Sequence, residues 1–144
     1  MMIVRVTDEK EAYRMEDLIE NLKKSPYLDE CGAIFTFEGI VRGVDDKRID
    51  KLVLTTPDTE RAQIELEGIV EDVRRKYPVR DVAVVHYLGE FYTSETLFMV
   101  AVAGPHREET LKALSEIIER TKHEIEFRKE EYTDSGKNII MSGG

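Results

Sequence analysis

The sequence predicts an α+β fold, with a mixed, largely antiparallel sheet and about three helices. Three segments carry apolar residues at helical spacing, and others are rich in the β-branched and aromatic residues that favour strands. Some predicted strands follow one another with no helix between them, which indicates partly antiparallel pairing. The 144 residues contain no repeat and no long linker, so we expect one domain over residues 1–144.

The N-terminal part is expected to contain a strand, a helix and the strongest strand pattern in the chain. Residues 2–6 alternate in polarity and predict a short strand. Asp8 is a plausible cap for a helix over 9–24, which ends before a Ser-Pro pair. Residues 32–42 are rich in β-branched and aromatic side chains, and Gly39 among them suggests a bulge or a close backbone approach.

The middle of the chain is expected to contain three strands and one helix. Residues 43–50 are charged and predict a loop, and residues 51–55 predict a strand after it. Residues 59–77 repeat apolar side chains at helical spacing up to a proline, so they predict a helix. Residues 79–88 and 95–103 contain strand-forming apolar runs.

The C-terminal part is expected to begin with a third helix over residues 106–123, directly after a Gly-Pro break. Residues 126–132 are expected to be short and extended, and residues 138–141 form a candidate final strand.

Two cations of this third helix are predicted to flank its apolar face. On a helical wheel the buried stripe consists of Leu111, Leu114, Ile117 and Ile118. Relative to the first of these, Lys122 falls about 20° away and Arg107 about 40° to the other side. Lys122 could extend along the apolar surface to solvent and interact with the C-terminal helix dipole, or both cations could face an anionic ligand.

The distance between these two cations limits how they can share a ligand. Arg107 and Lys122 are fifteen residues apart, which corresponds to about 22 Å along a straight helix. A compact ligand cannot contact both within one chain. A shared site would therefore need two copies of the chain, as a symmetric dimer provides.

Composition excludes several classes of function. The net charge of −9 argues against non-specific nucleic-acid binding. Neither a signal peptide nor a membrane span is expected, and Cys31 is the only cysteine, so a reducing, cytoplasmic location is expected. The three histidines lack metal-ligand spacing, so no metal site is expected: His86, His106 and His123.

Three segments together carry a family resemblance. Residues 32–42 form a glycine-led strand that ends in Gly-x-Val-Arg at Arg42, and residues 86–90 contain a His-x-x-Gly turn. The pair His106–Arg107 opens a helix that has Lys122 near its end, and Lys129 follows seven residues later. In this order and spacing the chain resembles the large subunit of molybdopterin synthase, over residues 2–136.

The resemblance implies an α/β-hammerhead-like fold and a sulfur-transfer activity. Members of this family form the molybdopterin dithiolene from cyclic pyranopterin monophosphate. The sulfur comes from the C-terminal thiocarboxylate of a small ubiquitin-like sulfur-carrier subunit that ends in Gly-Gly. The resemblance also implies a homodimer within a heterotetramer, without a metal or an organic cofactor.

The resemblance implies a role for five residues. Lys122 and Lys129 correspond to catalytic lysines, which can stabilise anionic intermediates and transfer protons. Arg42 and Arg107, with His106 beside the latter, correspond to substrate-binding residues, and a guanidinium suits phosphate oxygens.

Two departures from the family pattern leave an alternative open. Arg128 stands where the family usually has tryptophan, and Tyr87 stands where arginine is common. The chain could therefore be a non-catalytic relative that binds the carrier or a phosphate ligand. The terminal Gly143–Gly144 also matches the ending of sulfur carriers, but the length and helix content do not suit a small ubiquitin-like fold.

Overall fold

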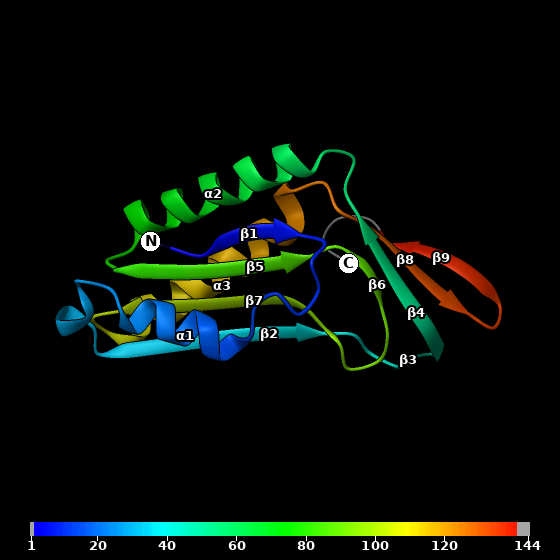
Figure 1. The fold of residues 1–144 in the computed structure, drawn as a ribbon, viewed down its shortest axis with the longest axis horizontal. Coiled ribbons are helices and arrows are strands. Elements are labelled where there is room, and N and C mark those ends of the chain that lie inside the picture. The colour runs from blue at the N-terminus through cyan, green and yellow to red at the C-terminus, as the bar shows by residue number, and fades with distance from the viewer. Residues whose placement is uncertain (1, 141–144) are drawn as a thin grey trace.

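The computed structural model describes residues 2–140, and it has an α+β architecture with two sheets and three α-helices (Figure 1). The predicted fold class is therefore confirmed. Among the described residues no helix is long and apolar enough to cross a bilayer.

The first sheet contains four strands in the order β1-β5-β7-β2. These strands are β1 (Val4–Thr7), β5 (Asp81–Tyr87), β7 (Thr96–Gly104) and β2 (Ala33–Ile40). β1 and β5 are parallel, and the other two pairs are antiparallel. β5 and β7 are buried along almost their whole length because helices cover both faces of the sheet, which explains their continuous apolar sequences.

The helices lie on opposite faces of this sheet (Figure 1). α1 (Met15–Lys23) packs on one face against β5 and β7. α2 (Thr59–Lys76) and α3 (Arg107–Glu124) pack against each other on the other face, and a short 3₁₀ turn, η1, spans Leu28–Glu30. Asp58 caps α2 by accepting a hydrogen bond from the Arg61 backbone N–H at 3.1 Å.

The second sheet lies beside the first and is antiparallel throughout. Its main path is β3-β4-β8-β9, and β6 pairs with Leu52–Leu54 of β4, which pair with β8 along their other edge. The strands are β3 (Val44–Asp45), β4 (Lys47–Thr55), β6 (Gly89–Phe91), β8 (Arg128–Thr133) and β9 (Gly136–Ile140). Because α3 leads directly into β8, the end of this helix lies where the two sheets meet.

The prediction for the first helix was wrong at its start. α1 begins at Met15, and the N–H that precedes it, on Arg14, is satisfied by Asp17 rather than by a cap at Asp8. The intervening segment is held in a turn conformation, because the Tyr87 hydroxyl accepts from the Tyr13 N–H at 3.0 Å and donates to the Tyr13 carbonyl at 2.9 Å. These non-local hydrogen bonds override the local helical pattern.

The predicted loop at 43–50 was also wrong. Asp46 has a φ of 65° and forms a tight turn, so that β3 and β4 make a hairpin there. The bulge suggested by Gly39 is confirmed, because the β2–β7 register shifts between Gly39 and Ile40. β6 was not predicted, and position 141 of the predicted last strand lies outside the described residues.

The apolar stripe of the third helix is confirmed only in part. Leu114 and Ile117 are buried and Ile118 is half-buried, but Leu111 is 50% exposed. Thr110, Ala113 and Thr121 complete the buried face instead.

Candidate functional site

Three cations from distant parts of the sequence approach one another at the junction of the two sheets. Lys122 lies in the last turn of α3, Lys129 lies in β8, and Arg42 lies just beyond β2. Lys122 and Arg42 are both close enough to Lys129 for their charges to lower its pKa. The net charge of the chain is −9, so this cluster is a local exception to an acidic molecule.

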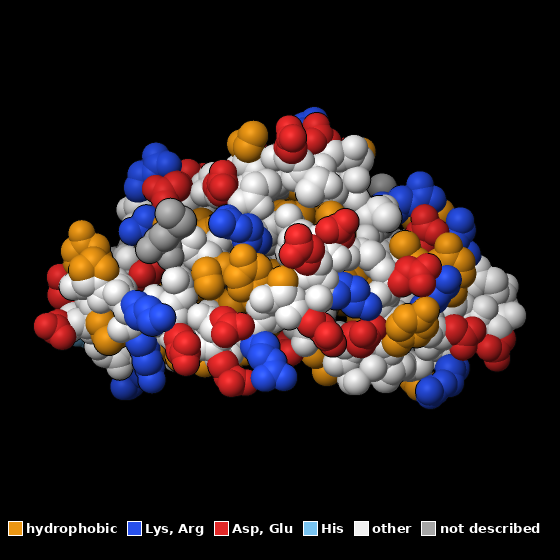
Figure 2. All heavy atoms as spheres, viewed as in Figure 1, with side chains coloured by type: hydrophobic (Ala, Val, Ile, Leu, Met, Phe, Trp, Pro, Cys, Tyr) orange, Lys and Arg blue, Asp and Glu red, His pale blue; other side chains and the backbone are white. Residues whose placement is uncertain are grey.

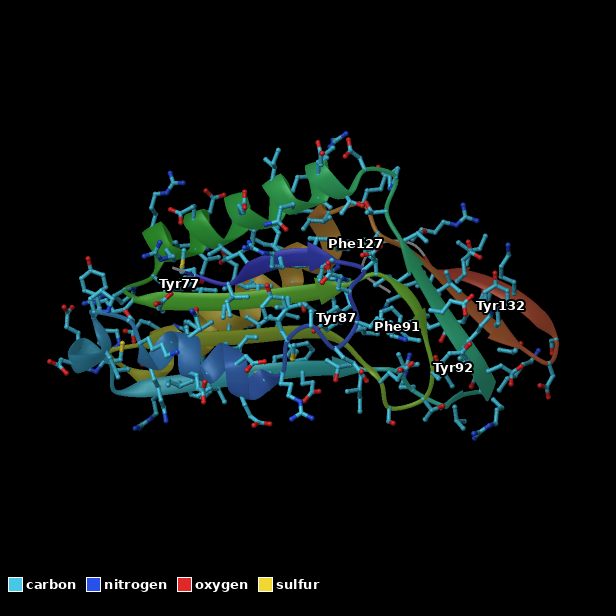
Figure 3. The ribbon with its side chains drawn as sticks, viewed as in Figure 1. Tyr77, Tyr87, Phe91, Tyr92, Phe127 and Tyr132 are labelled. Carbon is cyan, nitrogen blue, oxygen red and sulfur yellow. The ribbon has the colours of Figure 1, made fainter. Side chains whose placement is uncertain are left out.

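Aromatic rings pack beneath and beside these cations. The Lys122 ammonium lies 6.0 Å from the centroid of the Phe37 ring. Phe37 packs edge-on against Phe98 at 5.8 Å. Phe127, in the connection between α3 and β8, stacks on the His86 imidazole with 4.0 Å between ring centroids and 10° between ring planes. Phe127 is labelled in Figure 3.

Lys129 is the cation whose chemistry is most altered by this environment. The side chain is half-buried, and this desolvation lowers the pKa of its amine. The positive charges of Lys122 and Arg42 lower this pKa further, whereas the negative charge of Glu131 raises it. An amine with a lowered pKa exchanges protons more readily near neutral pH than an ordinary lysine. Lys129 therefore has the properties of a proton donor or acceptor at an anionic substrate.

His86 lies next to the same cations but carries no charge. It is only 5% exposed, and burial lowers its pKa to about 3, with further lowering from Lys129 and Lys122. His86 was not among the residues predicted for the site. A histidine inside a continuous apolar strand was the signal that could have identified it, because such a side chain needs a local reason to be buried.

Arg42 lies at the edge of the cation cluster. Its side chain is 67% exposed and forms an ion pair with Asp45 at 3.1 Å. An exposed guanidinium of this kind is free to exchange a weak surface ion pair for a bidentate contact with phosphate.

His106 and Arg107 lie at the opposite end of α3, away from Lys122. His106 occupies the N-cap position without a side-chain capping bond, Arg107 starts the helix, and both are exposed. In a single copy Arg107 is exposed, as is Leu111 one turn further along the helix. One copy of the chain brings Lys122, Lys129 and Arg42 together, but not His106 and Arg107.

The two departures from the family pattern lie outside the lysine cluster. Tyr87 points toward the α1 side of the first sheet, where its hydroxyl binds the Tyr13 backbone. Arg128 is 48% exposed and pairs with Glu130 at 3.0 Å, whereas its neighbour Lys129 is half-buried. Neither replacement removes a group from the cation cluster.

A hollow lies on the α1 side of the first sheet, the side that faces the viewer in Figure 2. It has a volume of about 640 Å³, and its lining includes Lys10, Glu38, Tyr87 and Glu95. Lys10 is already bonded to Glu95 at 3.2 Å. This hollow contains no member of the lysine cluster. Within residues 2–140 no group of three or more His, Cys, Asp or Glu side chains could hold a metal ion.

Residues 8–124 match the model of a protein family described as MoaE protein. The matched range includes Arg42, His106, Arg107 and Lys122, and Lys129 lies just beyond it. A molybdopterin synthase catalytic subunit from Taeniopygia guttata is 35% identical over 119 residues, which cover 81% of this chain and 74% of that protein.

Two solved structures show that this fold occurs in other proteins. Molybdopterin synthase from Staphylococcus aureus superposes with a TM-score of 0.84, at 23% identity, over 97% of this chain and 98% of the other. The complex of subunits 1 and 2 of molybdopterin-converting factor from Helicobacter pylori contains a chain with a TM-score of 0.68, at 20% identity, over 99% and 89% of the two chains.

Proposed function

This chain belongs to the MoaE protein family, and we propose that it is the catalytic subunit of a molybdopterin synthase. The observation that carries the proposal is the position of Lys129, which is half-buried beside Lys122 and Arg42 in an otherwise acidic molecule. Desolvation of a lysine costs free energy, and titratable groups perturbed by burial together with nearby charges are concentrated at functional sites. The two lysines are the ones that the family resemblance marks as catalytic.

The proposed substrate is cyclic pyranopterin monophosphate, and the proposed reaction transfers sulfur to it in two successive steps. Attack by sulfur creates anionic intermediates and opens a phosphate ester. Lys122, whose ammonium lies 6.0 Å from the centroid of the Phe37 ring, supplies positive charge near these groups. Lys129, with its lowered pKa, exchanges the protons.

The proposed sulfur donor is a small ubiquitin-like carrier with a C-terminal Gly-Gly thiocarboxylate. A thiocarboxylate is an anion, so the cation cluster would attract the carrier tail although the molecule as a whole is acidic. The two-subunit composition of the similar H. pylori assembly supports a small-subunit partner of this kind.

The phosphate of the substrate would be bound by Arg42 of one copy together with His106 and Arg107 of a second copy. The two ends of α3 are too far apart for a single copy to supply all of these groups. We therefore propose a homodimer within a heterotetramer, acting in the cytoplasm without a metal or an organic cofactor.

The test is conversion of the cyclic precursor by this protein mixed with a thiocarboxylated carrier. We expect Lys122→Ala and Lys129→Ala each to lower turnover by at least about 100-fold, because each removes a charge that acts in the transition state. Lys112→Ala is the control for the helix, since Lys112 is 62% exposed and pairs with Glu108, and Arg128→Ala is the control for the strand.

Two results would contradict the proposal. Turnover in the lysine variants equal to that of the wild type would exclude the catalytic roles. Binding of carrier and precursor by the wild type without turnover would show a non-catalytic relative instead.

A further inference from the structure

The His86 ring supports the connection that joins the two lysines of the site. α3 ends at Glu124, and β8 begins at Arg128. Between them the Phe127 N–H donates to the Ile125 carbonyl at 2.9 Å, which makes a tight turn. Phe127, the last residue of this turn, stacks on His86 at 4.0 Å.

This stack fixes the direction in which the strand leaves the turn. Phe127 is two residues before Lys129, so in an extended chain the two side chains point to the same side. Phe127 is 6% exposed, and His86 also lies 4.9 Å from Phe98, its partner in the β5–β7 pairing, with the two ring planes tilted by 40°. Because these rings are closely packed, a change at His86 disturbs Phe127, and a displaced Phe127 moves Lys129 with it.

A hydrogen bond holds the imidazole in one tautomer. His86 Nδ1 lies 3.0 Å from the Tyr87 carbonyl oxygen, which can only accept. Nδ1 therefore carries the proton, and Nε2 is the bare nitrogen of a neutral ring. A neutral ring can support two lysines at close range without adding a third positive charge.

We propose that His86 is a positioning residue for Lys129: its neutral ring, stacked on Phe127, fixes the start of β8 and keeps the Lys129 amine desolvated beside Lys122. The function of this arrangement rests on the proposed sulfur transfer, but the geometric claim does not. The charges that act on the Lys129 amine include Lys122 from α3, Arg42 beyond β2 and Glu131 from β8. The charges of Lys129 and Lys122 in turn lower the pKa of His86 in β5.

The experiment compares His86→Ala with His86→Phe. The alanine variant removes the ring, whereas the phenylalanine variant keeps an aromatic ring for Phe127 to stack on. Leu66→Ala is a matched control. Leu66 is fully buried in α2, so its replacement by alanine creates a cavity in the core at a residue that is not part of the lysine cluster. All four proteins are reductively methylated with ¹³C, and the Lys129 signal, assigned with a Lys129→Arg variant, is titrated by NMR. Turnover is measured on unmethylated protein across the same pH range.

We expect the Lys129 pKa to rise toward its ordinary value in His86→Ala, because water then reaches the amine. We expect kcat to fall by at least about tenfold, and the limb of the pH profile that reports Lys129 to shift upward in pH. His86→Phe should restore the pKa and bring kcat within about threefold of the wild type, and Leu66→Ala should leave the pKa unchanged.

The proposal is overturned if His86→Ala leaves the Lys129 pKa unchanged, or if His86→Phe shifts it as much as His86→Ala does. It is also overturned if Leu66→Ala gives the same shift, since His86 would then act only through general stability. The NMR titration needs no turnover. A wild-type protein that fails to convert the precursor would therefore refute the proposed function and still leave the positioning of Lys129 open to measurement.

Discussion

Mixing two inactive variants tests whether the active site is built from two copies of the chain. Arg107 and Lys122 stand at the two ends of α3, which spans Arg107–Glu124. Fifteen residues of helix correspond to about 22 Å, which is well beyond the reach of one pterin phosphate. We therefore predict that Arg107→Ala and Lys122→Ala, each inactive alone, complement each other.

The size of the recovery follows from the symmetry of a two-fold dimer. In a heterodimer, one site combines the intact Lys122 of the first chain with the intact Arg107 of the second, and the other site lacks both. Half of the sites in each heterodimer are thus complete. Random exchange at equal concentrations makes about half of all dimers heterodimers, so about a quarter of the wild-type activity should return.

The assay measures conversion of the cyclic precursor with excess thiocarboxylated carrier, after the two variants have exchanged subunits. Lys112→Ala mixed with Lys122→Ala serves as the control. Lys112 is exposed and paired with Glu108, so the Lys112→Ala chain should be fully active. Heterodimers should then supply complete sites equal to about a quarter of all sites, and Lys112→Ala homodimers should supply about a further quarter. The control mixture should therefore show about half of the wild-type activity. No recovery in the test mixture, although subunit exchange is demonstrated, would show that both residues serve a site within one chain.

Three further predictions concern stability. The pKa of His86 is about 3 in the folded state, so between about pH 6.5 and pH 3 the unfolded chain binds a proton that the folded chain does not bind. As the pH decreases over this range, the free energy of unfolding of the wild type should therefore fall by about 1.4 kcal/mol per pH unit more than that of His86→Phe. Parallel curves for the two proteins in urea unfolding would contradict this. Tyr87→Phe should cost about 1–3 kcal/mol, because it leaves the Tyr13 N–H without its acceptor, and should not change turnover; an activity loss larger than the unfolded fraction explains would place Tyr87 in the site. Gly104→Ala should lower the free energy of unfolding by about 1–3 kcal/mol, because the new methyl group would overlap the Thr110 hydroxyl. Adding Thr110→Ala should recover part of this loss in thermal denaturation. An unchanged denaturation midpoint for Gly104→Ala would show that α3 moves away freely.

Local sequence patterns were sufficient for the elements whose burial follows their own periodicity. The apolar runs of β5 and β7 and the helical spacing of α2 and α3 predicted these elements to within a few residues. The two lysines could also be placed near each other in advance, because only a short turn separates the helix that carries Lys122 from the strand that carries Lys129.

Tertiary structure decided where local preference was weak or was overridden. Residues 9–14 carry a helical pattern, but the buried Tyr87 hydroxyl holds the Tyr13 backbone in a turn. Leu111 fits an apolar stripe on a helical wheel and is nevertheless exposed, because no element within residues 2–140 covers its side chain. Periodicity describes only one element, whereas burial depends on its neighbours.

The sequence alone determined the charge, the candidate cations and the order of the elements, since each is a property of the chain itself. The chemical state of Lys129 and His86 was decided only by the fold. Their lowered pKa values arise from desolvation and from Lys122 beside them, and such effects exist only after β2, β5, α3 and β8 have packed around the same point.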